Sequence, residues 1–144
     1  MNDLKRPALT IQQLQTLRRI IPAYQMQVML ELTGSDDERD FFVERMIELE
    51  QTFQDMPHSG QTDGQGDDAV VRLHYFSSAG DWWITEKDSE HAQHQAFGIA
   101  DLGCREFGYI NIVDLIRSRH VEIDLHWKPI TVGEVMAKEV FESR

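Results

Sequence analysis

A predicted β-hairpin at residues 69–88 constrains the fold more than any other stretch of the sequence. Its residues are AVVRLHYFSSAGDWWITEKD, in which Ala69, Val71, Leu73 and Tyr75 fall on one face of the first strand and Val70, Arg72, His74 and Phe76 on the other. β-Branched and aromatic residues at period two are typical of a half-buried strand. Residues 77–80 supply the turn, where Gly80 is expected to take a positive φ, and residues 82–85 form the return strand.

Further strands and helices are predicted on both sides of this hairpin. Strand patterns occur at residues 95–100, 107–111 and 121–127, the last with strict apolar–polar alternation. Helices are predicted at residues 11–21, 36–56, 112–119 and 131–141, and residues 24–32 form either a further helix or an extended segment, with helix the favoured interpretation. Thr10 and Asn111 are predicted caps, and Ser35-x-x-Glu38 and Thr131-x-x-Glu134 have the spacing of capping boxes.

Strands joined by short turns, with helices before and after them, predict one α+β domain over residues 1–144. We expect an antiparallel meander sheet of about five strands with the helices packed on one face. A length of 144 residues fits a single domain with a core of its own. Residues 59–68, SGQTDGQGDD, are predicted to be a flexible connector.

Negative charge is concentrated in residues 31–68. The whole chain has 14 basic and 25 acidic residues, for a net charge of −11, and this segment alone has 12 acidic and 2 basic residues, for −10. Such a balance opposes direct binding to nucleic acid. Two interpretations stay open, a solvated helix face and an acidic surface offered to a basic protein partner. The predicted binding residues of that surface are Asp36, Asp37, Glu38, Glu44 and Glu48.

The polar face of the sheet provides the candidate residues for chemistry. The sequence has no nucleophile elbow, zinc-protease motif or dinucleotide-binding glycine motif. If the apolar residues of the last strand face the helices, Asp124 and His126 face away, on the side of Arg72 and His74, and Trp83 joins them if the hairpin register permits. This set is either an ordinary wet sheet face or a ligand or peptide groove, in which His74, Asp124 and His126 are the candidate catalytic residues.

Metal, disulfide and membrane features are weak or absent in the sequence. His91 and His94 are candidate metal ligands, because His-x-x-His places both imidazoles on one helical turn, and a solvated loop is the alternative. No cofactor is predicted. Cys104 is the only cysteine, and no run of about 18 apolar residues occurs. We therefore expect a cytoplasmic protein without intrachain disulfides or a membrane span.

Five short motifs in residues 73–135 together resemble the domain-of-unknown-function family 2958 (DUF2958). They are LHYF at residues 73–76, DWWITEKD at 81–88, AFG at 96–98, EFGYINIVDL at 106–115 and VEIDLHW at 121–127. The resemblance implies small proteins or modules that are often encoded on plasmids, phages and integrative elements. It implies no established activity and assigns no functional residue. Relative to short family members, residues 33–68 are expected to be an acidic helical insertion.

On these grounds we expect a protein of a mobile-element-associated family that is not an enzyme and that binds another protein, as an accessory or host-interaction factor. The most specific version of this hypothesis is an antirestriction or anti-defence role. A small enzyme or ligand-binding protein that uses the polar sheet face is the second hypothesis. A nucleic-acid-binding module is the third. A second copy of the chain that covers the polar sheet face is a further expectation.

Overall fold

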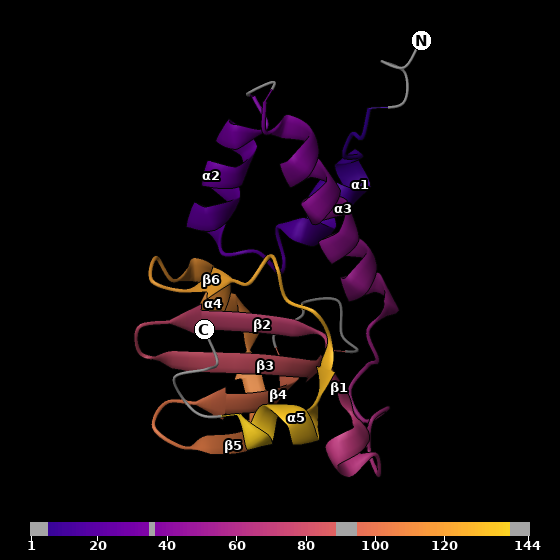
Figure 1. Ribbon diagram of the computed structural model, residues 1–144, viewed down its shortest axis with the longest axis vertical. Coiled ribbons are helices and arrows are strands. Elements are labelled where there is room, and N and C mark those ends of the chain that lie inside the picture. The colour runs from indigo at the N-terminus through magenta and orange to yellow at the C-terminus, as the bar shows by residue number, and fades with distance from the viewer. Residues whose placement is uncertain (1–5, 35–36, 89–94, 139–144) are drawn as a thin grey trace.

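The computed structural model describes residues 6–34, 37–88 and 95–138, and it has the α+β architecture that the sequence predicts (Figure 1). The helices are α1 (Ile11–Leu17), α2 (Ala23–Leu32), α3 (Arg39–Asp55), α4 (Ile112–Arg117) and α5 (Val132–Ala137), and η2 (Gly66–Asp68) is a 3-10 turn. The strands are β1 (Val70–Val71), β2 (Leu73–Ser77), β3 (Gly80–Glu86), β4 (Gln95–Asp101), β5 (Arg105–Asn111), β6 (Glu122–Ile123) and β7 (Ile130–Thr131).

Five strands form one antiparallel sheet in the order β5-β4-β3-β2-β6, and β1 pairs with β7 in a separate two-stranded sheet. The predicted hairpin is β2–β3, in which His74 lies opposite Trp83 and Phe76 opposite Asp81. Residues two apart in one strand share a face of the sheet. This register therefore places His74, Phe76, Asp81 and Trp83 on the same face.

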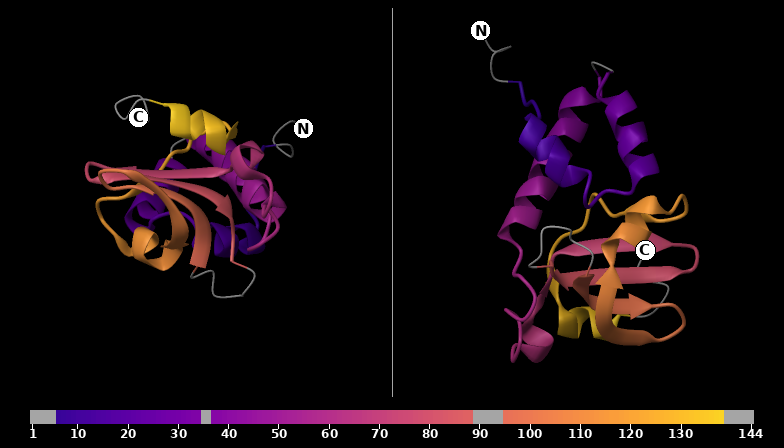
Figure 2. Two further views of the ribbon diagram at one scale, coloured as in Figure 1. Left: turned by 90° about the horizontal axis from the view of Figure 1, so that it is seen from below. Right: turned by 180° about the vertical axis from the view of Figure 1, so that it is seen from behind.

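Both faces of the sheet are covered. Leu73, Tyr75 and Ile84 belong to the larger core, to which α1, α2, α3 and α4 all contribute. On the opposite face, Trp83 and Ile99 pack with residues of β1 and α5. Figure 2 shows α5 and α4 on opposite sides of the sheet, and α1 to α3 grouped beyond its β6 edge. The α+β prediction is confirmed, and the structure adds that α5 covers the face opposite to the other helices.

The predicted helix ends are only partly observed. The Thr10 side chain accepts from the Gln13 backbone, and the Gln13 side chain accepts in return from the Thr10 backbone, which is a capping box. The Asn111 cap and the Thr131–Glu134 capping box are confirmed. The expected start at residue 36 is wrong, because α3 begins at Arg39. Ser35 and Asp36 lie outside the described residues, and α5 ends at Ala137.

The predicted strand at residues 121–127 is mostly wrong. Only Glu122 and Ile123 pair with β2. The Asp124 side chain then accepts from the His126 backbone N–H at 2.9 Å, and this local bond turns the chain out of the sheet. Gln25 completes the outer side of β6, because its amide nitrogen donates to the Ile123 carbonyl at 3.0 Å and its amide oxygen accepts from the Ile123 N–H at 2.8 Å.

Two glycines are required by close contact between strands. A Cβ atom at Gly80 would lie 2.1 Å from the Asp101 carbonyl oxygen, and one at Gly98 would lie 1.9 Å from the Trp83 carbonyl oxygen. Gly80 is not among the residues with positive φ, so that expectation is wrong. Close approach of the neighbouring backbone explains both positions.

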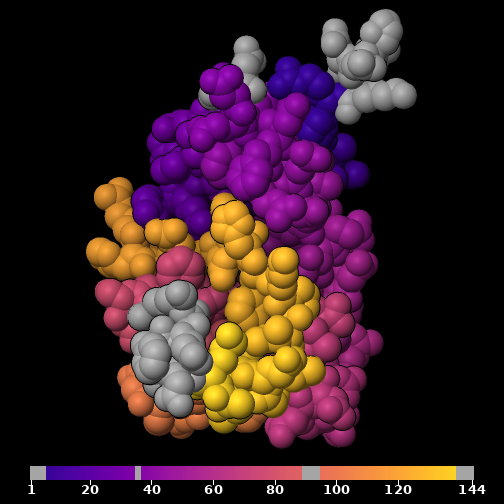
Figure 3. Space-filling view, viewed as in Figure 1, coloured from indigo at the N-terminus to yellow at the C-terminus, as the bar shows by residue number. Residues whose placement is uncertain are grey.

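The described helices include none that is both long and apolar enough to cross a membrane. In the space-filling view, the orange and yellow segment that leads into α5 covers much of the sheet (Figure 3). Its packing against the sheet forms the site described next.

Candidate functional site

A histidine held between two carboxylates lies at the centre of the candidate site. His74 Nε2 is 2.9 Å from Asp81 Oδ1, and His74 Nδ1 is 3.2 Å from Asp124 Oδ2. Asp81 comes from β3, and Asp124 follows β6, where its backbone N–H donates to the His74 carbonyl at 2.8 Å. The imidazole and the Asp81 side chain are almost fully buried, whereas 28% of the Asp124 side chain is exposed. We call these three residues the His74 cluster.

Aromatic rings surround the imidazole on its remaining sides. Its ring centre lies 5.5 Å from that of Trp83 with an interplanar angle of 9°, 5.0 Å from that of Trp127, and 5.7 Å from that of Phe76. Trp127 is fixed by a hydrogen bond from its indole N–H to the Val71 carbonyl at 3.1 Å. The expectation of a wet polar sheet face is therefore wrong at His74, because this face carries a second apolar core.

The hydrogen-bond pattern restricts the protonation of the His74 cluster. A neutral imidazole has one N–H group, yet both ring nitrogens of His74 face carboxylate oxygens. The two contacts are both satisfied when His74 is an imidazolium, or when one carboxyl keeps its proton. The hydrogen bond from His74 lowers the pKa of the Asp124 carboxyl, against the opposing effect of its partial burial.

Asp124 also lines a pocket between α3 and the sheet. The pocket has a volume of about 210 Å³. Its walls come from α3, from the residue between β1 and β2, and from the segment between β6 and β7. They comprise Arg45, Glu48, Leu49, Thr52, Arg72, Asp124, Leu125, Trp127 and Pro129. We call this cavity the Arg72 pocket, and the His74 cluster lies directly behind its Asp124 wall.

Arg72 is the cation of this pocket that has no carboxylate partner. Its Nε atom is buried and makes no hydrogen bond, and none of the acidic side chains in the described residues forms an ion pair with its guanidinium. The second guanidinium of the pocket, on Arg45, forms an ion pair with Glu48 one helical turn later. The Arg72 pocket therefore combines a free guanidinium, the Asp124 carboxylate and an apolar wall that includes Trp127.

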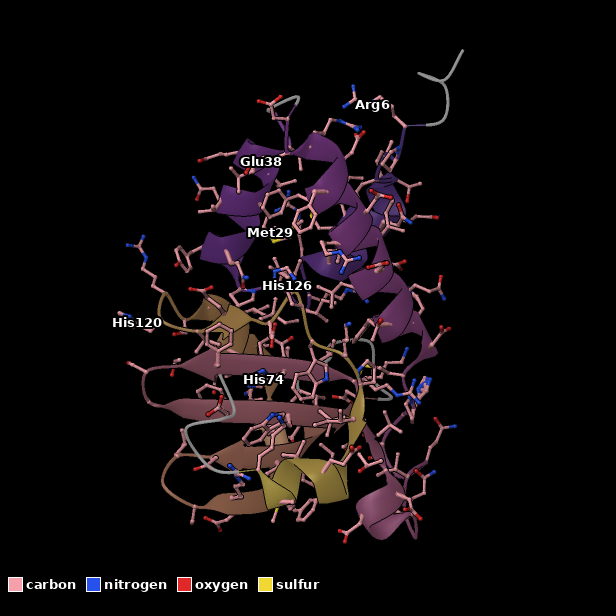
Figure 4. All side chains as sticks on the ribbon, viewed as in Figure 1. Arg6, Met29, Glu38, His74, His120 and His126 are labelled. Carbon is pink, nitrogen blue, oxygen red and sulfur yellow. The ribbon has the colours of Figure 1, made fainter. Side chains whose placement is uncertain are left out.

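The structure brings together some of the predicted site residues and separates others. His74 and Asp124 are in contact, and Arg72 shares the pocket with Asp124. Trp83 is fully buried and stacks between His74 and the Arg105 guanidinium, which is 5.3 Å from its ring centre. His126 is exposed in the turn after β6, where its ring centre lies 6.2 Å from that of Phe41 on α3 and its backbone N–H donates to Asp124 (Figure 4).

Asp81 is the member of the His74 cluster that sequence reasoning missed. The signal was available in the hairpin, because a two-residue turn at Ser78 and Ala79 places Phe76 opposite Asp81. His74 and Asp81 are then diagonal neighbours on one face of the sheet, within reach of a side-chain contact. The sequence analysis began the return strand at Trp82 and therefore did not assign Asp81 to either face.

The predicted acidic and metal-binding residues are distributed over the surface or lie outside the described part of the chain. Asp37, Glu38 and Glu44 are exposed, and Glu48 lines the Arg72 pocket. Asp36, His91 and His94 lie outside the described residues. Within residues 6–34, 37–88 and 95–138, no group of three or more potential metal ligands occurs.

Comparison with known proteins gives one match. Residues 43–131 match the model of the family described as "Protein of unknown function (DUF2958)". The match extends from α3 to the start of α5 and so includes every residue of the His74 cluster and the Arg72 pocket. No curated protein matches, and no solved structure matches.

Proposed function

The chain belongs to the DUF2958 family of proteins of unknown function, and from this membership and the geometry of its site we propose that it is a binding protein whose Arg72 pocket receives a small anionic ligand. The observation that carries the proposal is that Arg72 lines the pocket, has no carboxylate partner among the described residues, and keeps a buried Nε atom without a hydrogen bond. A buried N–H group without an acceptor costs roughly 1–3 kcal/mol. A carboxylate or phosphate in the pocket would pair with the Arg72 guanidinium through charge-assisted hydrogen bonds.

The other walls of the pocket indicate what else the ligand carries. Leu49, Leu125 and Trp127 provide apolar surface, which favours a ligand with an apolar or planar part. Asp124 supplies a hydrogen-bond acceptor for a ligand hydroxyl or amine. Its negative charge opposes an anion less than that of a free carboxylate, because its Oδ2 atom is held by His74. The pocket thus suits a small molecule with one anionic end and a nearby donor.

Binding is favoured over acid–base catalysis by the position of His74. A general base must reach the proton that it removes. The His74 ring is 1% exposed, both of its nitrogens are engaged by carboxylates, and His74 is not among the residues that line the pocket. These contacts support a positioning role, in which His74 fixes the Asp124 carboxylate. The His126 ring packs near Phe41 on α3, and His126 contacts Asp124 through its backbone N–H, so its imidazole is not part of the buried set around His74.

The proposal is tested by titration of the full chain with phenyl phosphate, benzoate and inorganic phosphate, followed by thermal unfolding and calorimetry. We expect phenyl phosphate or benzoate to raise the unfolding temperature in a concentration-dependent way. Arg72→Gln should weaken this binding by about tenfold or more, since it removes a charged hydrogen bond. Arg119→Gln, which removes an exposed guanidinium elsewhere, is the matched control. Equal binding by both variants, or no binding of any probe, contradicts the proposal.

As a second candidate function, we propose that the protein is an accessory or host-interaction factor of a mobile-element-associated family. In this role its acidic surface would bind a basic partner, as an antirestriction or anti-defence protein does. The exposure of Asp37, Glu38 and Glu44 supports this candidate. Asp40 and Glu48 contribute less, because Asp40 is paired with Arg6 and Arg39, and Glu48 with Arg45. The deciding measurement is the affinity for a basic nuclease between about 50 and 300 mM salt, since an electrostatic interface must weaken over that range. An affinity that does not change with salt removes this candidate.

A further inference from the structure

The outer edge of β5 is a second unassigned feature, independent of the Arg72 pocket. β5 is the end strand of the five-stranded sheet, and within the described residues no strand pairs with its outer side. At the other end of the sheet, the Gln25 side chain occupies the outer side of β6. β5 therefore presents a row of backbone N–H and C=O groups along seven residues, Arg105–Asn111.

β5 lacks the features that usually protect such an edge. Natural edge strands are commonly blocked by lysine, proline or a bulge. The β5 sequence REFGYIN has charged residues only at its start, Arg105 and Glu106, contains neither lysine nor proline, and pairs regularly with β4 over all seven residues. Phe107 and Tyr109 point to one face of the sheet and are 52% and 69% exposed. An exposed aromatic edge of this kind is typical of a surface that pairs with another segment.

A second pocket adjoins this edge on the same face of the sheet. It has a volume of about 290 Å³ and lies between the connector, β3, β4, β5 and α5. Its lining residues are Thr62, Asp63, Gly64, Gly66, Asp67, Ala69, Thr85, Phe97, Phe107 and Val132. We call it the Asp63 pocket. It shares no lining residue with the Arg72 pocket.

The Asp63 pocket has the chemistry of a receptor for a cationic side chain. Asp63 and Asp67 contribute exposed carboxylates, and none of the lining residues is basic. Phe97 and Phe107 form a stacked pair, with ring centres 6.4 Å apart and an interplanar angle of 18°. Carboxylates attract an ammonium or guanidinium group, and aromatic faces add a cation–π contribution of about 0.5–2 kcal/mol.

From these observations we propose that the β5 edge and the Asp63 pocket together bind an extended, basic segment of a partner protein. Phe107 connects the two parts, because it belongs to β5 and also lines the pocket. A segment that adds to β5 as a further strand gains main-chain hydrogen bonds, and alternate side chains of the segment fall on the face of Phe107. A lysine or arginine among them reaches the Asp63 pocket. The net charge of −11 steers a basic segment toward the protein.

The test uses the full chain labelled with nitrogen-15 and a short synthetic peptide of alternating lysine and threonine. We expect saturable shifts of the β5 backbone amides, and slower hydrogen exchange at those that pair with the peptide. The double variant Asp63→Asn, Asp67→Asn should weaken binding by about tenfold, and a peptide with glutamine in place of lysine should bind the native chain more weakly.

A matched control separates the site from general attraction. The double variant Glu31→Gln, Asp114→Asn also removes two exposed carboxylates, but from α2 and α4, and should bind the peptide as the native chain does. Equal loss in both double variants, peptide-induced shifts confined to α3, or no binding at all overturns the proposal. The anion titrations of the Arg72 pocket use other probes and other variants, so the two proposals fail separately.

Discussion

Asp124 connects the buried His74 cluster with the Arg72 pocket through its two carboxylate oxygens. Oδ2 accepts from His74, and Oδ1 accepts from the His126 backbone N–H at 2.9 Å. The first bond fixes the carboxylate against the sheet, and the second forms the turn that ends β6. A single side chain thus determines both the chain path after β6 and the polar wall of the pocket.

Asp124→Asn is expected to destabilise the protein at neutral pH by about 1–2 kcal/mol, because it removes a charge-assisted hydrogen bond. The pKa of Asp124 is lowered in the folded protein, so its contribution to stability is present above the ordinary value of 3.8. It is lost as the pH falls through the lower, folded-state pKa. Urea unfolding of both proteins at several pH values between 7 and 3 measures the difference, which should shrink below about pH 4.

Glu44→Gln is the control for this pH series, because Glu44 is exposed on α3 and its side chain forms no hydrogen bond or ion pair within the described residues. Its effect on the free energy of unfolding should stay within about 0.5 kcal/mol. A difference between Asp124→Asn and the native chain that grows on acidification would show that the folded protein does not favour the ionised carboxyl of Asp124.

The two proposed sites differ in how far the sequence alone predicts them. Strand parity places His74, Arg72 and Asp124 on one side of the sheet, and the structure confirms that His74 and Asp124 meet. The pocket itself also needs Arg45 on α3, which lies far from Asp124 in the sequence. The spacing of residues within α3 or within the strands does not predict that these two elements pack side by side. His126 was assigned to the set from alternation, and the Asx turn at Asp124 moves it away.

At the scale of elements, Lys87 joins the end of β3 to the end of α3. Its ammonium donates to the carbonyl oxygens of Phe53 and Gln54 at 2.7 and 3.1 Å, and it lies 4.8 Å from the Phe53 ring centre. The last carbonyls of a helix have no partner within the helix. Burial lowers the pKa of the Lys87 ammonium, while Asp55 and Glu50 oppose that effect.

Lys87→Met is therefore expected to destabilise the protein by about 1–3 kcal/mol, because two helix-terminal carbonyls lose a charged donor. Hydrogen exchange of the amides in the last turn of α3 should accelerate more than exchange in β4, since the loss is local to the helix end. Lys128→Met, at an exposed position, is the control. Unchanged exchange at residues 52–56 in Lys87→Met would show that the ammonium does not hold the helix end.

Element prediction succeeds where local side chains decide the structure. The caps at Thr10, Asn111 and Thr131 were predicted because each motif acts within four residues, and all three are observed. Residues 121–127 show the opposite case. Their alternation correctly marks Val121 and Ile123 as buried, but Trp127 packs on the other face of the sheet. The alternation of apolar and polar residues shows which side chains are buried. It does not show that the chain passes from the larger core to the smaller one.

At the scale of the molecule, one sheet separates two cores whose residues alternate along the same strands. In β2 and β3, Leu73, Tyr75 and Ile84 pack in the larger core, and Trp83 packs in the smaller one. A strand cannot lose its packing on one face and keep its position for the other. The helical part and α5 should therefore unfold together, as expected for a small domain with two-state behaviour.

Two core truncations on opposite faces test this cooperativity. Met46→Ala in the larger core should cost about 2–5 kcal/mol, and Val135→Ala in the smaller core about 2 kcal/mol, because both side chains are fully buried. In urea, the far-ultraviolet circular dichroism reports the helices, and the tryptophan fluorescence reports in part the rings of Trp83 and Trp127. Each variant should shift both signals to the same lower midpoint. If Val135→Ala lowers the fluorescence midpoint and leaves the helical signal in place, the smaller core unfolds independently, and α5 is then a separable cover over Trp83 and Ile99.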